Sequence, residues 1–163
     1  MQGADCRVRP ATIDDVSVIH AFIHKKAVFD RETGAFSGTV GTNEERIRAT
    51  LFGDRPFARV LLAELDGAPR AFALFYFRYS SFSGRPSLWL DDLYVDDGAR
   101  SRGVGDRLMA VLMHTATEHD CSHLAWTAAV QNPRGIAFYR RLGARIVEQT
   151  PVQVTFWWTP AAA

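Results

Sequence analysis

A β-strand, a loop with two glycines and a helix follow one another between residues 87 and 119, and this order constrains the fold more than any other feature. Residues 87–95 are rich in β-forming side chains, and apolar residues recur at helical spacing from Gly103 onward. In such a loop the backbone N–H groups and the positive end of the helix dipole point at one place, which predicts a site for a phosphate or pyrophosphate. Three arginines add positive charge: Arg100, Arg102 and Arg107.

Two common phosphate-binding motifs do not fit this loop. A P-loop requires Gly-Lys-Ser/Thr, whereas Asp106 follows Gly105 here. A dinucleotide fingerprint requires a third glycine, and this chain has Leu108 at that position. By itself, the loop is equally well interpreted as an ordinary glycine turn before a helix.

The strand over residues 87–95 changes its alternation in the middle. Leu88 and Leu90 share one phase, and Leu93 and Val95 share the other, so the slip falls on Asp91-Asp92. A β-bulge absorbs such a slip, and bulges are common beside active sites. The alternative is that the two aspartates end a strand before a turn.

The remaining elements predict an α/β fold with one mixed (α+β) sheet and helices on both faces. A capping box of Thr42 and Glu45 opens the second helix, and Asp66-Gly67 joins two strands as a hairpin. We predict a single domain over residues 1–163 with the element order β-α-α-β-β-β-α-β-α-β-β. In chain order, these elements are expected at residues 6–9, 13–29, 42–51, 58–65, 71–79, 87–95, 103–119, 123–127, 132–143, 144–148 and 153–159.

Composition excludes several classes of protein. The formal net charge of +1 argues against a nucleic-acid binder, and no apolar run approaches the roughly 18 residues that span a membrane. Cys6 and Cys121 form no CxxC pair and are interpreted as free thiols, so we expect a cytoplasmic protein. The five histidines match no standard zinc spacing, so no metal is expected, and the arginines at 140, 141 and 145 are interpreted as a solvated face.

A third motif lies near the C-terminus. Asn132 is a good N-cap, Pro133 suits the first position of a helix, and Gly143 suits its end. Tyr139 lies on this short helix; taken alone, its ring is best interpreted as a cover for the core, with proton donation as the alternative.

These motifs together resemble the GNAT superfamily of N-acetyltransferases. Arg-x-x-Gly-x-Gly at 100–105 resembles its coenzyme A motif, and Phe-Tyr-x-x-Leu-Gly-Ala at 138–144 resembles its C-terminal motif. Within the superfamily, residues 75–77, residues 90–95 and Trp126 look most like the diamine (spermidine/spermine and thialysine) acetyltransferase branch.

The resemblance implies a strand that splays from its neighbour and an acetyl-CoA site in the gap. The backbone of Leu93, Tyr94 and Val95 would pair with the pantetheine arm, and Asn132 would touch it. The residues that would wrap the pyrophosphate are Arg100, Ser101, Arg102, Gly103, Val104, Gly105 and Asp106.

The resemblance also implies catalytic and acceptor residues. Tyr139 would protonate the leaving thiolate, and Asp91 would accept the proton of the amine, although the diamine branch usually carries Glu there. Phe29, Asp30, Asp92 and Trp126 would line the amine site.

The function expected is transfer of an acetyl group to a primary amine of a small molecule, by direct attack on the thioester. A non-catalytic acyl-CoA-binding or sensing module is the alternative. Lys25 and Ser80 stand where polyamine-specific relatives carry acids, so a smaller amine, such as thialysine, another amino acid or a short diamine, fits about as well as a polyamine. We expect a homodimer, because the C-terminal strand with Trp157 and Trp158 is apolar.

Overall fold

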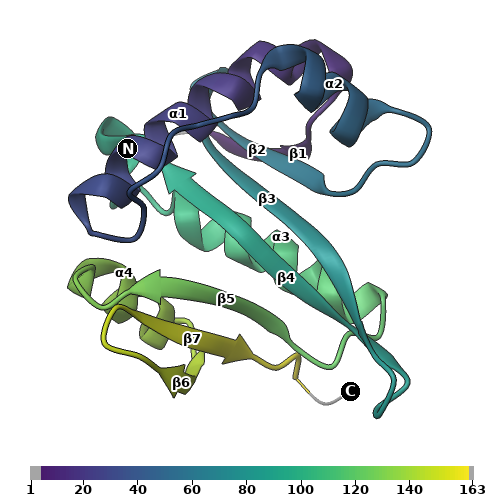
Figure 1. Cartoon of the computed structure of the whole chain (residues 1–163), viewed down its shortest axis with the longest axis vertical. Helices are drawn as coiled ribbons and strands as arrows, with labels where there is room; N and C mark the ends of the chain where they lie inside the picture. Colours follow the sequence, from purple (N-terminus) through teal and green to yellow (C-terminus); the bar gives the residue numbers. More distant parts are fainter. Residues whose placement is uncertain (1–4, 162–163) are drawn as a thin grey trace.

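The computed structural model describes residues 5–161, which are built around one seven-stranded sheet (Figure 1). The strand order is β1-β2-β3-β4-β5-β7-β6, and every neighbouring pair is antiparallel except β4 and β5, which are parallel. The mixed sheet and the predicted order of elements are therefore confirmed. The predicted domain over 1–163 includes residues 1–4 and 162–163, which lie outside the described residues. The strands are β1 (Cys6–Pro10), β2 (Arg59–Leu65), β3 (Ala68–Ser80), β4 (Arg85–Val95), β5 (Leu124–Ala129), β6 (Arg145–Gln149) and β7 (Gln153–Trp158).

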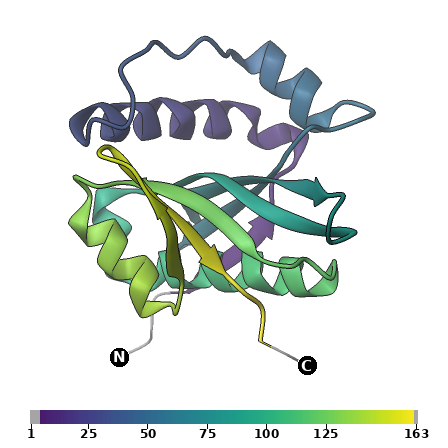
Figure 2. The same cartoon turned by 60° about the horizontal axis from the view of Figure 1, so that its bottom comes forward.

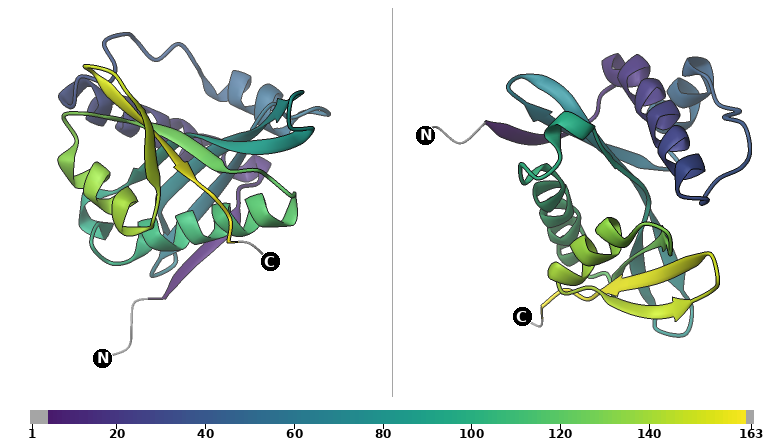
Figure 3. Two further views of the ribbon diagram at one scale, coloured as in Figure 1. Left: turned by 90° about the horizontal axis from the view of Figure 1, so that it is seen from below. Right: turned by 90° about the vertical axis from the view of Figure 1, so that its left-hand side faces the viewer.

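Helices cover both faces of the sheet, as Figures 2 and 3 show. One face carries α1 (Val16–Glu32) and α2 (Glu44–Phe52), and the other carries α3 (Val104–Glu118) and α4 (Pro133–Arg141). Successive side chains of a strand point to opposite faces. Accordingly, Leu62 of β2 is buried with α1 and α2, whereas its neighbours Leu61 and Ala63 are buried with α3. Among residues 5–161, no helix is long and apolar enough to span a bilayer.

Local signals explain most of the connections. Asp66 and Gly67 both have positive φ (54° and 77°), as a two-residue type I′ hairpin requires, and they join β2 directly to β3. The first predicted helix instead begins as a short 3₁₀ turn at Ile13–Asp15 and continues as α1 to Glu32. The predicted capping box of Thr42 is wrong, because the N-cap of α2 is Asn43, whose side chain accepts a hydrogen bond from the Arg46 N–H at 2.9 Å.

The predicted bulge lies in β4. In the register of β3 and β4, Leu74 is opposite Asp92 and Phe75 is opposite Leu90, so Asp91 is the extra residue. The sheet opens at the same level, because β4 and β5 form register pairs only at Leu88 and Trp89. Beyond Trp89 the two strands diverge, as Figure 1 shows. The bulge and the splay together create the space in which the candidate site lies.

Candidate active site

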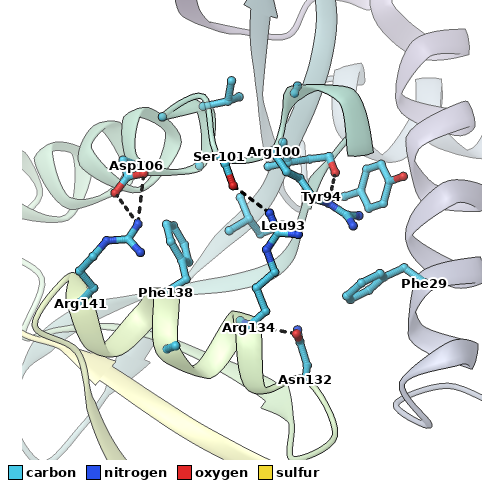
Figure 4. Close-up of a pocket in the computed structure, with 17 residues that line it drawn as sticks. Phe29, Leu93, Tyr94, Arg100, Ser101, Asp106, Asn132, Arg134, Phe138 and Arg141 are labelled. Atoms are coloured by element: carbon cyan, nitrogen blue, oxygen red, sulfur yellow. Dashed lines mark hydrogen bonds and ion pairs between the residues drawn. The ribbon is translucent and has the colours of Figure 1, made fainter.

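A cavity of about 360 Å³ lies at the end of the splayed strand, and we call it the loop cavity. It is lined by Phe29 of α1, the end of β4, the loop that leads into α3, and one side of α4 (Figure 4). It contains most of the residues that the sequence assigned to the cofactor: Leu93, Tyr94, Val95, Arg100, Ser101, Gly103, Val104, Gly105, Asp106 and Asn132.

The loop is shaped to present backbone N–H groups to this cavity. Gly103, the N-cap of α3, has a left-handed conformation (φ 77°), and no side chain caps this end of the helix within the described residues. Ser101 is also left-handed (φ 61°), which is unusual for a residue with a Cβ. An uncapped helix N-terminus attracts anions, because its first N–H groups lack partners and the dipole is positive there.

Of four arginines around the loop, two line the loop cavity and two do not. Arg134 and Arg141 reach from α4 to the loop, where Arg134 donates to the Ser101 hydroxyl at 3.1 Å and Arg141 to the Asp106 carboxylate at 3.2 Å (Figure 4). Both line the loop cavity, although Arg141 is still 63% exposed, and Arg134 was missed in the sequence. Arg102 and Arg107 do not line the loop cavity. Arg102 pairs with Asp66 at 3.5 Å, and Arg107 donates to the Cys6 carbonyl at 3.0 Å.

The edge of β4 supplies further backbone groups. Leu93, Tyr94 and Val95 pair with β3 on one side and line the loop cavity on the other. On that second side they have no strand partner in the described part of the chain. An extended ligand with amide groups can therefore bind this edge much as a further strand does.

A second cavity, of about 210 Å³, adjoins the first, and we call it the aspartate cavity. Phe29, Leu93 and Asn132 line both cavities, so the two meet beside the bulge. The aspartate cavity brings together the remaining residues singled out in the sequence, which come from α1, β4, β5 and α4: Asp30, Asp91, Asp92, Trp126 and Tyr139.

The two aspartates of the bulge have different surroundings. Asp91 is exposed and accepts a hydrogen bond from Nε1 of Trp89 at 3.2 Å. The side chain of Asp92 is only 25% exposed. The pKa of Asp92 is raised to about 6, chiefly by burial and less by the Asp91 and Asp30 carboxylates, against the opposing effect of the nearby Lys26 ammonium. Asp92 therefore changes charge close to neutral pH.

The phenol of Tyr139 belongs to an aromatic cluster. Its ring centroid lies 4.9 Å from that of Trp126 and 5.3 Å from that of Phe156. Burial, with a contribution from the Asp30 carboxylate, raises the pKa of Tyr139 above its ordinary value, so its hydroxyl stays protonated at neutral pH. Trp126 is only 2% exposed and its Nε1 has no hydrogen-bond partner within residues 5–161, so it forms the floor of the cavity rather than an open wall.

One charged residue of the aspartate cavity was missed in the sequence. Lys26 of α1 lines the cavity, pairs with Asp30 one turn later, and has its Nζ atom 3.7 Å from Oδ1 of Asp92. Its helical spacing was the available signal, because Lys26 follows the buried Phe22 by four residues. Lys25, which stands where polyamine-specific relatives carry an acid, lines neither cavity and pairs with Asp96 at 2.8 Å.

Residues 25–144 match the family model described as the acetyltransferase (GNAT) family. The chain belongs to this family. This GNAT protein is therefore an acyltransferase, and the resemblance inferred from its motifs is confirmed.

Curated relatives of this GNAT acetyltransferase agree with that assignment. It is 29% identical over 161 residues to the thialysine N-epsilon-acetyltransferase of Mus musculus, covering 94% of this chain and 92% of the relative. It is 31% identical over 146 residues to the protein of that name from Bos taurus, covering 85% and 83%. The L-ornithine N5-acetyltransferase of Arabidopsis thaliana is 25% identical over 188 residues, covering 88% and 81%. These relatives confirm the likeness to the diamine acetyltransferase branch.

Solved structures confirm the fold. An aminoglycoside acetyltransferase from an uncultured soil metagenomic sample superimposes with a TM-score of 0.74 at 19% identity, covering 89% of this chain and 91% of that one. An acetyltransferase of Thermus thermophilus superimposes with a TM-score of 0.71 at 21% identity, covering 98% and 99%.

Proposed function

We propose that this acetyltransferase transfers the acetyl group of acetyl-CoA to a primary amine of a small molecule, by direct attack of the amine on the thioester. The acceptor is a diamine, a polyamine or an amino-acid-like amine. The observation that carries the proposal is that the loop cavity and the aspartate cavity share Phe29, Leu93 and Asn132. A site that fits an anionic, extended cofactor thereby opens onto a site that fits a cation.

Acetyl-CoA suits the loop cavity by its chemistry, and proteins of the GNAT family use it. When bound, it supplies the acetyl group as a thioester. The uncapped start of α3 and the left-handed Ser101 and Gly103 would hold the pyrophosphate, while Arg134 and Arg141 add positive charge. The free edge of β4 at Leu93–Val95 would pair with the amides of the pantetheine arm. Backbone N–H groups beside the bulge would polarise the thioester carbonyl.

Carboxylates of the aspartate cavity would bind the acceptor and take its proton. An amine with a pKa near 10 is mostly protonated at neutral pH and must lose a proton before it attacks. We assign the role of proton acceptor to Asp91, the extra residue of the bulge. The structure adds Asp92 as a second candidate, because burial raises its pKa to about 6, closer to the working range of a general base.

Tyr139 would donate a proton to the leaving sulfur. The residue before it, Phe138, lines the loop cavity, whereas Tyr139 lines the aspartate cavity, so α4 borders both. Its raised pKa keeps the Oη proton in place for this step. A module that only binds or senses acyl-CoA would require neither Tyr139 nor Asp91, so the presence of both in the aspartate cavity supports the enzyme over that alternative.

Release of free thiol from acetyl-CoA tests the proposal. The acceptor panel contains spermidine, putrescine, thialysine, lysine, an aminoglycoside and a peptide N-terminus. We expect amine-dependent release, lowered about 10²–10⁴-fold in the variant that loses the base. Asp91→Asn and Asp92→Asn are matched substitutions that separate the two carboxylates. Tight coenzyme A binding without release from any amine would contradict transfer to these acceptors and favour the sensing alternative, and no coenzyme A binding would refute the proposal.

Two further expectations are part of the proposal. Cys6 and Cys121 are both buried and unpaired, which supports a cytoplasmic location. Trp157 stacks on His123 and is still 39% exposed. An exposed aromatic side chain on β7 supports the proposed homodimer, in which a second copy would cover it. A solution mass equal to one chain would contradict the dimer.

A further inference from the structure

Two consecutive lysines of α1 have different surroundings, and only one belongs to the candidate site. Lys25 is 48% exposed and pairs with Asp96, outside both cavities. Lys26 is only 18% exposed and lines the aspartate cavity. Its ammonium pairs with Asp30 and lies 3.7 Å from the nearer oxygen of Asp92.

Lys26 presents to these carboxylates the same chemical group that an acceptor presents. A protonated acceptor amine that enters the cavity must therefore share Asp30 and Asp92 with a tethered primary ammonium. The other charged side chains lining the cavity are carboxylates, Asp30, Asp91 and Asp92, so Lys26 changes its formal net charge from −3 to −2.

This charge affects different amines differently. Spermidine has three amino groups that are mostly protonated at neutral pH, and each ammonium that approaches Lys26 is repelled. An amino acid with a side-chain amine carries a carboxylate as well, and a carboxylate is attracted to the Lys26 ammonium. Like-charge contacts against the wrong partner are a common source of specificity.

We infer that Lys26 is a specificity-determining residue, which makes the acceptor site favour an amino acid with a side-chain amine over a polyamine. This inference rests on the proposed function, because it names the acceptor class of the same site. Lys26 acts on the acceptor through charge and takes no proton from it. Its effect is therefore expected in the choice between acceptors rather than in the affinity for coenzyme A.

The experiment compares kcat/KM for lysine and for spermidine in the full chain. The wild-type protein is expected to prefer lysine. In Lys26→Met, the ratio of the two values is expected to move about tenfold towards spermidine, the size of change that one charge contact of ~1.4 kcal/mol produces. Lys26→Arg keeps the charge and is expected to keep the preference. Lys26→Gln is a polar replacement for the case in which methionine disturbs folding, and thermal unfolding and coenzyme A affinity report on the integrity of each variant.

Lys25→Met is the matched control, because it removes the same charge from the adjacent position of α1. Its ratio is expected to stay within about twofold of the wild-type value, since Lys25 lies outside the cavity. A wild-type preference for spermidine, an unchanged ratio in Lys26→Met and Lys26→Gln, or an equal shift in Lys25→Met would each overturn the inference while leaving the acetyltransferase proposal intact. Absence of turnover with every amine would overturn the proposed function, and the inference with it.

Discussion

The Nζ atom of Lys26 lies 3.7 Å from Oδ1 of Asp92, at the point where α1 meets the bulge of β4. The two residues have opposite effects on the charge of the site. Burial raises the pKa of Asp92, and the Lys26 ammonium holds that pKa down to about 6. The charge of the acceptor site is thus set by a contact between elements that are distant in the sequence.

The pH dependence of turnover is expected to report this contact. Below pH 6 Asp92 becomes protonated and can neither bind an ammonium nor accept a proton, so kcat/KM should fall on the acid side with an apparent pKa of about 6. In Lys26→Met the favourable ammonium is lost, so the pKa of Asp92 should rise and the acid limb should move to higher pH. Profiles of kcat/KM between about pH 5 and 9 measure the shift. The Lys25→Met profile should coincide with that of the wild type, and movement of the Lys26→Met limb to lower pH would contradict the assignment.

Replacing Tyr139 by phenylalanine removes one oxygen and keeps the ring. The packing against Trp126 and Phe156 should therefore survive, and thermal unfolding should change little. Because coenzyme A thiolate is a fair leaving group, we expect kcat to fall by about 10–100-fold, towards the low end of general-acid effects. Steady-state kinetics with saturating acetyl-CoA measure kcat. A variant with the wild-type kcat would show that the Tyr139 hydroxyl takes no part in catalysis and that the residue only packs its ring in the aromatic cluster.

Gly105 marks a close approach between the start of α3 and the ring of Phe138. A Cβ at this position would lie 3.2 Å from Cζ of Phe138, which lines the loop cavity. Gly105→Val should push this ring into the cavity, and an overpacking cost of ~1–3 kcal/mol corresponds to a rise in the Kd for coenzyme A of about 5- to 150-fold. Titration calorimetry with coenzyme A measures the Kd.

The control for this substitution is Gly98→Val in the preceding turn. A Cβ at Gly98 would meet no atom within 4 Å, and Gly98 does not line the cavity. Its Kd should therefore match that of the wild type. Equal weakening in both variants would point to a general disturbance of the loop instead of the contact with Phe138.

The parts of the site that could be predicted from the sequence are those encoded by neighbouring residues. The slip from Leu90 to Leu93 indicated the bulge because the alternation of a strand is local, and it is confirmed by the register with β3. The glycines before α3 and the Asn132 cap of α4 are local for the same reason, and Asn132 accepts from the Gly135 N–H at 3.0 Å.

What could not be predicted depends on contacts between distant elements. Helical spacing places Lys26 rather than Lys25 on the buried side of α1, but only the packing of α1 against β4 brings Lys26 to Asp92. Arg134 lines the loop cavity only because α4 packs beside the start of α3, which no periodicity specifies. Thr42 and Asn43 are both good N-caps, and the choice of Asn43 follows from the helix start that buries Ile47.

An ion pair of two residues that line neither cavity, Arg9 and Asp15, is expected to stabilise the fold. Asp15 accepts hydrogen bonds from both terminal nitrogens of Arg9, at 2.7 and 2.9 Å, and from the Thr12 N–H at 2.7 Å, while its side chain is only 11% exposed. The Arg9 guanidinium lowers the pKa of Asp15 from 3.8 to about 2. The stabilisation is therefore complete above the unfolded-state pKa and is lost as the pH falls through about 2.

Asp15→Asn should lower the free energy of unfolding by roughly 1–2 kcal/mol at neutral pH, and by less at about pH 3. Urea denaturation at the two pH values measures both differences, with the exposed neighbour Asp14→Asn as a control that should change stability by no more than about 0.5 kcal/mol. A loss in Asp15→Asn that stays the same at both pH values would show that the ionised carboxylate is not its source.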